Sequence, residues 1–202
     1  LLDGAMDEPE ILKHFLDRTA KSIERLNTLV DDLDEISKIE RGEVSMAKET
    51  FEINQLAKDV LESMELKAKR KSISLSIRKG FDKPFFVFAD KEKIRQVITN
   101  LVDNSIKYGN INGETTASFY DMDDNVLIEI TDNGIGIAEE HLPRLFERFY
   151  RIDKHRSREQ GGTGLGLAIV KHIIEAHQQT INVRSTVGVG TTFAFTLQKS
   201  KG

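Results

Sequence analysis

Residues 125–137 read NVLIEITDNGIGI, an alternating run that ends in an acid, an amide and two glycines. The alternation predicts a half-buried strand, and glycines that follow a strand often bring the backbone close to a ligand. The alternative is an ordinary loop in which the glycines only turn the chain. A carboxylate beside glycine-opened backbone can accept a hydrogen bond from an exocyclic amine. Adenine offers such a donor, whereas guanine has an acceptor at the matching position, so Asp132 favours adenine.

Segments with strand or helix patterns surround this run. Strand patterns cover residues 72–78, 84–90, 114–122, 180–186 and 191–198, with residues 84–90 expected to be a buried strand. Residues 114–122 and 125–132 form one predicted hairpin, and the last two segments form another. Helical patterns cover residues 52–70, 91–109 and 165–178, with a shorter one over 138–151. Helices together with an antiparallel or mixed sheet predict the α+β class, as a two-layer α/β sandwich of about 150 residues.

The first forty residues have a different pattern. Between Pro9 and Gly42 the chain contains neither Gly nor Pro. Apolar residues recur with the alternating steps of a helical-bundle seam, at Leu12, Leu16, Ile23, Leu26, Val30 and Leu33. A helix from Pro9 to Ile39 would be roughly 45 Å long at about 1.5 Å per residue. A lone helix of this length with an apolar face needs partners, so we expect a helix from a bundle.

The composition excludes several classes of function. The net charge of -4 and the aromatic content of 7% give no reason to expect nucleic acid as a partner. There is no cysteine, which removes disulfides, thiolate metal sites and cysteine nucleophiles. The five histidines lack metal-ligand spacing. No run approaches 18 apolar residues, so no segment is expected to span a bilayer.

Residues 100–109, NLVDNSIKYG, place two amides on one helix face. Asn100 and Asn104 are four residues apart, and Lys107 and Tyr108 follow within a turn. Amide oxygens are hard, neutral ligands suited to Mg²⁺, which often keeps water and substrate phosphate in its shell. The alternative is a pair of solvated asparagines on an ordinary helix.

Residues 161–170, GGTGLGLAIV, open a helix with a run of glycines. Backbone N–H groups at the positive end of the helix dipole would form a seat for phosphate; the alternative is a simple flexible loop. Neither GxxxxGK[ST] nor GxGxxG is present, so a nucleotide would be held in another way. The basic run FERFYRIDKHRSRE precedes this seat. Within it we favour Arg151 as a ligand contact and expect three other cations to be solvated, namely Lys154, Arg156 and Arg158.

These four stretches, in this order, resemble the N, G1, F and G2 boxes of the catalytic and ATP-binding domain of sensor histidine kinases. That domain belongs to the ATPase superfamily shared with Hsp90, DNA gyrase and MutL. The leading helix resembles the second helix of the dimerisation and histidine-phosphotransfer domain of a kinase of the PhoR-like type. The resemblance implies part of that hairpin in residues 1–43 and the ATP-binding domain in residues 44–202.

The resemblance also implies roles for matched residues. Asn104 would bind Mg²⁺, and Asn100 would support the triphosphate side of ATP. Asp132 would receive the adenine amino group, and Gly134 and Gly136 would let the base approach.

The remaining matched residues would complete the ATP site. Lys107 would contact phosphate, Tyr108 would line the adenine, and Arg151 would meet the γ-phosphate. Apolar walls would be formed by Ile106, Ile137, Leu165 and Phe195. The glycine run would hold phosphates and close over them through Gly162, Thr163, Gly164, Leu165 and Gly166.

One position separates kinases from hydrolases in this superfamily. The gyrase, Hsp90 and MutL hydrolases resemble one another in a Glu that activates water, four residues before the metal-binding Asn. This chain has Asn100 there, and an amide cannot act as a general base at neutral pH. The site is therefore expected to align ATP for transfer to an acceptor from outside the pocket. Steady ATP turnover without an acceptor would revive the hydrolase alternative.

The acceptor expected for a histidine kinase is not found in the sequence. The family places it in an H-E-x-x-x-P-like box on the preceding helix, and the 202 residues contain no such box. His14 lacks the acidic neighbour and the proline, and the other histidines read as helix or lid residues, namely His141, His155, His172 and His177. We expect this chain to bind ATP and Mg²⁺ without phosphorylating itself.

The resemblance also suggests the biological setting. A longer parent would form a homodimer through the helical bundle and pass its phosphate to the receiver domain of a response regulator. The part of the parent in these residues would be cytoplasmic, and other segments would anchor the parent in a membrane. The alternative is a non-catalytic signalling module that uses nucleotide only to change shape. Without the preceding helix, the apolar stripe of residues 11–36 should be exposed and self-associate.

Overall fold

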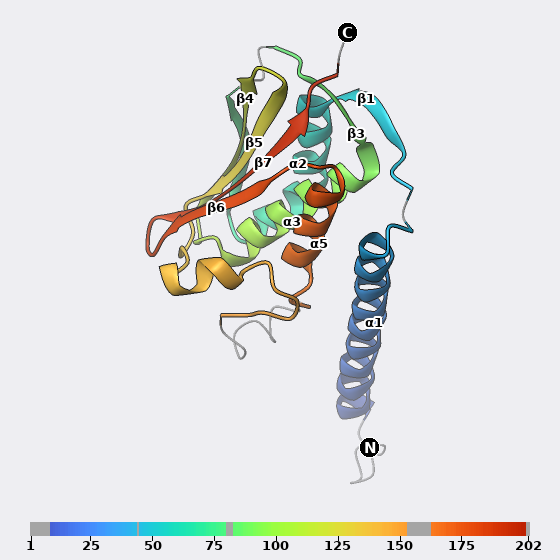
Figure 1. Ribbon diagram of the computed structural model, residues 1–202. Coiled ribbons are helices and arrows are strands. Elements are labelled where there is room, and N and C mark those ends of the chain that lie inside the picture. Colours follow the sequence, from blue (N-terminus) through green and yellow to red (C-terminus); the bar gives the residue numbers. More distant parts are fainter. Residues whose placement is uncertain (1–8, 44, 80–82, 153–162, 201–202) are drawn as a thin grey trace.

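The computed structural model describes residues 9–43, 45–79, 83–152 and 163–200 (Figure 1). A five-stranded sheet has the order β2-β4-β5-β7-β6, in which β2 and β4 are parallel and the other neighbours are antiparallel. Its strands are β2 (Ser74–Lys79), β4 (Glu114–Met122), β5 (Asn125–Asp132), β6 (Ile181–Thr186) and β7 (Gly190–Gln198). The two predicted hairpins, β4–β5 and β6–β7, are confirmed.

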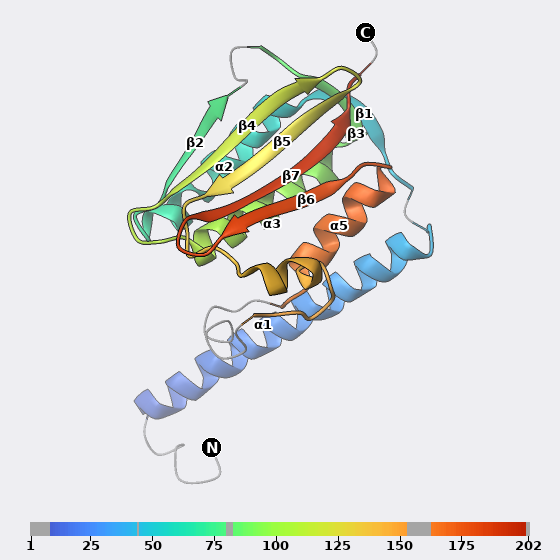
Figure 2. The ribbon, with the colours of Figure 1, turned by 60° about the vertical axis from the view of Figure 1, so that its left-hand side comes forward.

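Three helices cover one face of this sheet (Figures 1 and 2), and they are α2 (Ile53–Lys69), α3 (Lys91–Tyr108) and α5 (Gly166–Ala176). Each has an apolar face that packs against inward-facing strand residues. In β5 these are Val126, Ile128 and Ile130, all at most 1% exposed. The α+β class and the two-layer sandwich are thereby confirmed.

A second, two-stranded sheet lies beside the helices. β1 (Lys48–Glu52) pairs antiparallel with β3 (Phe86–Asp90). The prediction of a buried strand over residues 84–90 was wrong in part, because Phe86 and Phe88 are 50% and 44% exposed. Only one face of β3 packs on the core, through the buried Val87 and Ala89. β1 was not predicted from the sequence.

The helix predicted over residues 138–151 is much shorter in the structure. A 3-10 helix, η1, covers only Glu139–Arg144 and contains Pro143. Proline lacks the N–H that a continuing helix needs, and bends and turns follow up to Tyr150.

The long first helix, α1 (Pro9–Glu40), agrees closely with the predicted span. Two residues after its end lies Gly42, whose φ of 68° is the left-handed conformation that often follows a helix C-terminus. The C-terminal half of α1 packs along α5 with Ile36 fully buried, while its N-terminal half extends beyond the sandwich (Figure 2). In the described part of the chain, no helix combines the length and the apolar character needed to cross a bilayer.

Candidate functional site

Helix α3 carries the two predicted amides along the margin of its buried face. Asp90 caps the helix by accepting the N–H of Lys93 at 3.1 Å. Asn100 and Asn104 are both half-buried. A Cβ added at Gly166 would lie 3.7 Å from the side-chain oxygen of Asn100. The first turn of α5 and the amide face of α3 are therefore neighbours, which is the placement that a shared phosphate site would need.

The end of α3 is joined to the loop that follows β5. The carbonyl oxygen of Tyr108 accepts the N–H of Ile135 at 3.3 Å. A Cβ at Gly134 would lie only 2.6 Å from that oxygen, and one at Gly136 would overlap the carbonyl oxygen of Thr186. The structure thus gives both glycines a reason other than the predicted approach of a base, because the chain itself passes too close for a side chain.

Asp132 lies at the end of β5, where the sheet meets this loop. Alternation places its side chain on the same sheet face as the core residue Ile130, under the helices. Its Oδ1 accepts the N–H of Gly134 at 2.8 Å. Burial raises the pKa of Asp132, although hydrogen bonds from the N–H groups of Gly134 and Thr191 oppose the shift. A half-buried carboxylate with remaining acceptor capacity suits a hydrogen-bond donor on a ligand.

Two cations converge near the end of α3. Burial, together with the neighbouring charge of Arg151, lowers the pKa of Lys107. Burial raises the pKa of the Tyr108 hydroxyl, whereas the charge of Arg151 acts to lower it. Lys107 Nζ lies 5.3 Å from the centre of the Tyr108 ring. Asp103 acts on both groups in the opposite sense to Arg151, and an excess of positive charge in a half-buried place favours an anion.

The aromatic segment before the basic run is tied to the glycine run. The N–H of Phe149 donates to the carbonyl oxygen of Gly164 at 2.9 Å. Both residues have positive φ, 61° and 78°. A Cβ at Gly164 would lie 3.1 Å from the Cα of Phe149 and 3.4 Å from the Cγ of Arg151. Gly164 therefore permits Phe149 and Arg151 to pass close to the chain just before α5.

The glycine run leads directly into α5. Thr163 Oγ1 accepts the N–H of Leu165 at 3.2 Å, and α5 begins at Gly166. Gly162 lies outside the described residues, together with the basic residues Lys154, Arg156 and Arg158. The start of α5 lies beside Asn100, and the positive end of a helix dipole favours a phosphate group near it.

The predicted apolar walls are mostly core residues. Ile106 is 2% exposed, and Leu165 and Phe195 are fully buried. Phe195 is not brought to the site: it pairs with Ile128, whereas Asp132 pairs with Thr191, four residues away along β7. Only Ile137 of the four is half-buried, and its N–H donates to Ser185 Oγ at 2.8 Å.

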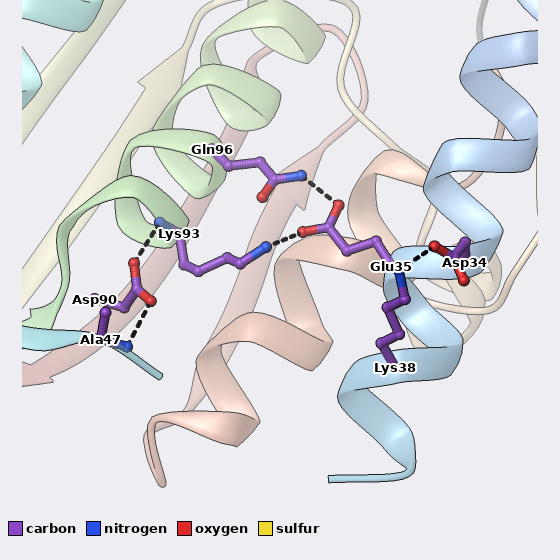
Figure 3. A network of polar contacts seen from close by, with 7 residues as sticks. All are labelled: Asp34, Glu35, Lys38, Ala47, Asp90, Lys93 and Gln96. Atoms are coloured by element: carbon purple, nitrogen blue, oxygen red, sulfur yellow. Dashed lines mark hydrogen bonds and ion pairs between the residues drawn. The ribbon is translucent and has the colours of Figure 1, made fainter. Parts of the chain in front are cut away.

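Helix α1 contacts the glycine run and α3 through acidic residues that no motif in the sequence marks. Thr163 Oγ1 donates to Asp32 Oδ2 at 3.2 Å, and burial raises the pKa of Asp32. One turn away, the carboxylate of Glu35 accepts hydrogen bonds from Lys93 Nζ and Gln96 Nε2 of α3, each at 2.6 Å (Figure 3).

A further acid on α1 completes this interface. Glu40 forms an ion pair with Arg148 and lies 3.4 Å from His172 Nε2. The bond to Arg148 lowers the pKa of Glu40. No local sequence signal marks such contacts, because each joins segments that are far apart along the chain.

Comparisons with known proteins agree with this geometry. Residues 89–201, more than half of the chain, match the family described as histidine kinase-, DNA gyrase B-, and HSP90-like ATPase. The sensor histidine kinase WalK of Bacillus subtilis (strain 168) is 36% identical over 199 residues, which are 98% of this chain and 32% of that protein. The chain thus spans about a third of that relative.

Solved structures show the same arrangement of helix and sandwich. The Acinetobacter baumannii histidine kinase AdeS matches 99% of this chain and 92% of its own, with a TM-score of 0.77 and 26% identity. The histidine kinase ThkA, solved in complex with the response regulator protein TrrA, matches 96% of this chain and 53% of its own, with a TM-score of 0.76 and 26% identity. With the amide face, the buried acid and the glycine run in the predicted order, the chain belongs to the histidine kinase-, DNA gyrase B- and HSP90-like ATPase family.

Proposed function

We propose that this chain is the kinase core of a two-component sensor histidine kinase, which binds ATP with Mg²⁺ and transfers the γ-phosphoryl group to a histidine. The observation that carries the proposal is that a half-buried acid and a cation lie on segments joined at the end of α3. Asp132 precedes the loop whose Ile135 N–H binds the carbonyl oxygen of Tyr108, and Lys107 is the residue before Tyr108. Arg151, next to Gly164, adds its charge to that of Lys107. An acid and two cations together are complementary to adenine, with its exocyclic amine, joined to an anionic tail.

The donor set fits a magnesium ion that arrives with nucleotide phosphates. Asn104 would supply an amide oxygen, and Asn100 beside Gly166 would support the phosphate side. Bound there, Mg²⁺ would neutralise charge on the phosphates during transfer. Thr163, Gly164 and Gly166 would present the backbone of the α5 start to the same phosphates.

The same residues favour phosphoryl transfer over hydrolysis. Asn100 occupies the position at which the related hydrolases carry a water-activating Glu, and an amide cannot remove a proton from water at neutral pH. Arg151 would meet the γ-phosphate, since its Cγ lies where a side chain at position 164 would come within 3.4 Å of it, next to the glycine run. Catalysis would then rest on alignment and on charge stabilisation.

The acceptor histidine and the later steps belong to the proposal as well. The relatives include named sensor histidine kinases, and ThkA was solved with a response regulator. We infer that a histidine on a partner helix of the bundle receives the phosphate and that the aspartate of a receiver domain receives it next. The parent would dimerise through α1 and its partner helix and would act in the cytoplasm. Residues 1–43 would belong to that bundle and residues 44–202 to the ATP-binding domain.

A transfer assay with separate components tests this function. The chain is mixed with a polypeptide that carries the preceding bundle helix of a related kinase, with its acceptor histidine, and with labelled ATP and Mg²⁺. We expect acid-labile, base-stable phosphohistidine on the added helix, and none when its histidine is replaced by glutamine. An Asn104→Ala variant should lose the label. Steady release of phosphate without the helix would instead indicate a hydrolase, and ATP binding without any transfer would indicate a non-catalytic module.

A further inference from the structure

The C-terminal ends of α2 and α3 meet at one lysine. α2 and α3 pack beside each other under the sheet (Figure 2). Lys71, just beyond the end of α2, donates from Nζ to the carbonyl oxygens of Ile106 at 3.0 Å and Lys107 at 2.6 Å. Carbonyl groups in the last turn of a helix lack partners within the helix. An ammonium group that binds them also offsets the negative end of the helix dipole.

The backbone holds Lys71 firmly in this position. In the turn after α2, Ser72 has the left-handed conformation with φ of 55°, and the N–H of Ile73 donates to the carbonyl oxygen of Ala68 at 3.1 Å. Ile73 is 5% exposed and anchors the turn in the core. From the other side, the N–H of Asn112 donates to the Lys71 carbonyl oxygen at 3.4 Å. The backbone at Lys71 is therefore held in place independently of the contacts that its side chain makes with α3.

The turn that Lys71 grips carries three features of the nucleotide site. Lys107 Nζ lies 5.3 Å from the centre of the Tyr108 ring, and the charge of Arg151 acts on it. The carbonyl oxygen of Tyr108 holds the N–H of Ile135 in the loop after Asp132. Lys71, Lys107, Tyr108 and Ile135 also line one hollow of about 350 Å³. A shift of this turn would move the cation and the loop together.

We propose that Lys71 is a positioning residue of the nucleotide site. By binding the last carbonyl groups of α3, it sets the position of Lys107 for the phosphates and, through Tyr108, the position of the glycine loop that flanks Asp132. The proposal rests on the proposed function for its effect on ATP, but its effect on the loop does not depend on that function.

The test compares Lys71→Met with Lys69→Met in the whole chain. Methionine keeps much of the apolar stem and removes the charge. Lys69 is a matched control because it lies two residues earlier, at the end of α2, and its side chain forms an exposed ion pair with Glu65 at 2.9 Å. Two quantities are measured: the affinity for ATP with Mg²⁺, by titration calorimetry, and the amide hydrogen exchange of Ile135 without nucleotide. The free energy of unfolding of each variant is also measured, so that any fraction of unfolded protein is subtracted.

We expect Lys71→Met to bind ATP about tenfold more weakly, the size expected for the loss of hydrogen bonds from a charged group. Exchange at Ile135 should be faster than in the unsubstituted protein, and Lys69→Met should change neither quantity. Unchanged Ile135 exchange in Lys71→Met, or a loss of affinity no larger than its unfolded fraction explains, overturns the proposal. If the unsubstituted protein binds no ATP, the proposed function fails, and Ile135 exchange alone decides the role of Lys71.

Discussion

At the scale of single residues, Asp132 is a partly buried acid whose charged form is disfavoured by the fold. Its carboxylate is desolvated under the helices, and burial outweighs the two N–H groups that it binds, so its pKa is raised. A charged form held against its own solvation lowers the stability of the nucleotide-free protein. This pattern is typical of functional sites rather than of groups that stabilise a fold.

Replacing Asp132 with Asn should separate its effect on stability from its effect on ATP binding. The amide oxygen can still accept the N–H of Gly134, but the charge is gone. Without nucleotide, we expect the variant to be at least as stable as the unsubstituted protein at neutral pH. Its ATP affinity should fall about 10- to 100-fold, the range for a hydrogen bond to a charged group. Thermal denaturation with and without ATP measures both quantities, and an ATP-induced shift equal to that of the unsubstituted protein would remove Asp132 from the binding site.

The pH dependence has a definite sign. Because the pKa of Asp132 is raised in the folded state, folding favours its protonated form. Its contribution to stability is fully present below the ordinary pKa of 3.8 and is lost as the pH rises through the folded value. The free energy of unfolding of Asp132→Asn, minus that of the unsubstituted protein, should therefore grow with pH above 3.8 and then level off. Urea titrations across this pH range measure the difference.

At the scale of elements, the spacing of apolar residues predicted the helices and strands that bury one continuous face. α2, α3, α5 and the four strands of the two hairpins follow from apolar patterns, since each buries one face. In the second sheet, β1 was not predicted and β3 was expected to be more buried than it is. This pair of strands buries only part of one face, and its pairing joins residues about forty apart. The short η1 differs from prediction because Pro143 interrupts an otherwise helical composition.

The docking of α1 also belongs to this scale. Glu35 lies between α1 and α3, with its side chain 18% exposed and that of Lys93 25% exposed. Replacing Glu35 with Ala would leave the ammonium of Lys93 and the amide of Gln96 without this partner. We expect a loss of about 1–3 kcal/mol in the free energy of unfolding, with faster amide exchange in the facing turns of α1 and α3.

Asp34 provides the matched control for Glu35. It lies next to Glu35 on the same helix but pairs only with Lys38 at 2.6 Å, in water and away from α3 (Figure 3). Asp34→Ala should change the free energy of unfolding little, because an exposed pair of this kind contributes little. Equal losses in the two variants would show that the Glu35 contacts do not hold α1 against the sandwich.

At the scale of the whole molecule, α1 is divided between two environments. Asp32, Glu35, Ile36 and Glu40 attach its C-terminal half to the ATP-binding unit. The sequence predicted the helix and the glycine run of the site separately. It could not predict their contact, because Thr163 and Asp32 are 131 residues apart and neither type is specific to an interface. The family resemblance supplied the order of the site residues, whereas the structure assigns several apolar ones to the core.

The N-terminal half of α1 presents an apolar stripe to solvent. Leu16, Ile23, Leu26 and Val30 are 53–64% exposed, and they follow the bundle spacing seen in the sequence. A contiguous exposed apolar surface of this kind favours association in water. We therefore expect the average mass in sedimentation equilibrium to rise with protein concentration.

Charge placed in the stripe should abolish this association. Leu26→Glu puts a carboxylate in the middle of the stripe, and the variant should stay monomeric with the thermal stability of the sandwich unchanged, because Leu26 is 60% exposed. Leu66→Glu is the matched control: Leu66 is 77% exposed on α2, away from the stripe, so its variant should associate like the unsubstituted chain. A chain that remains strictly monomeric at the highest concentration would show that the stripe has too little apolar area to drive pairing by itself. In that case α1 would depend on a partner helix from outside these residues.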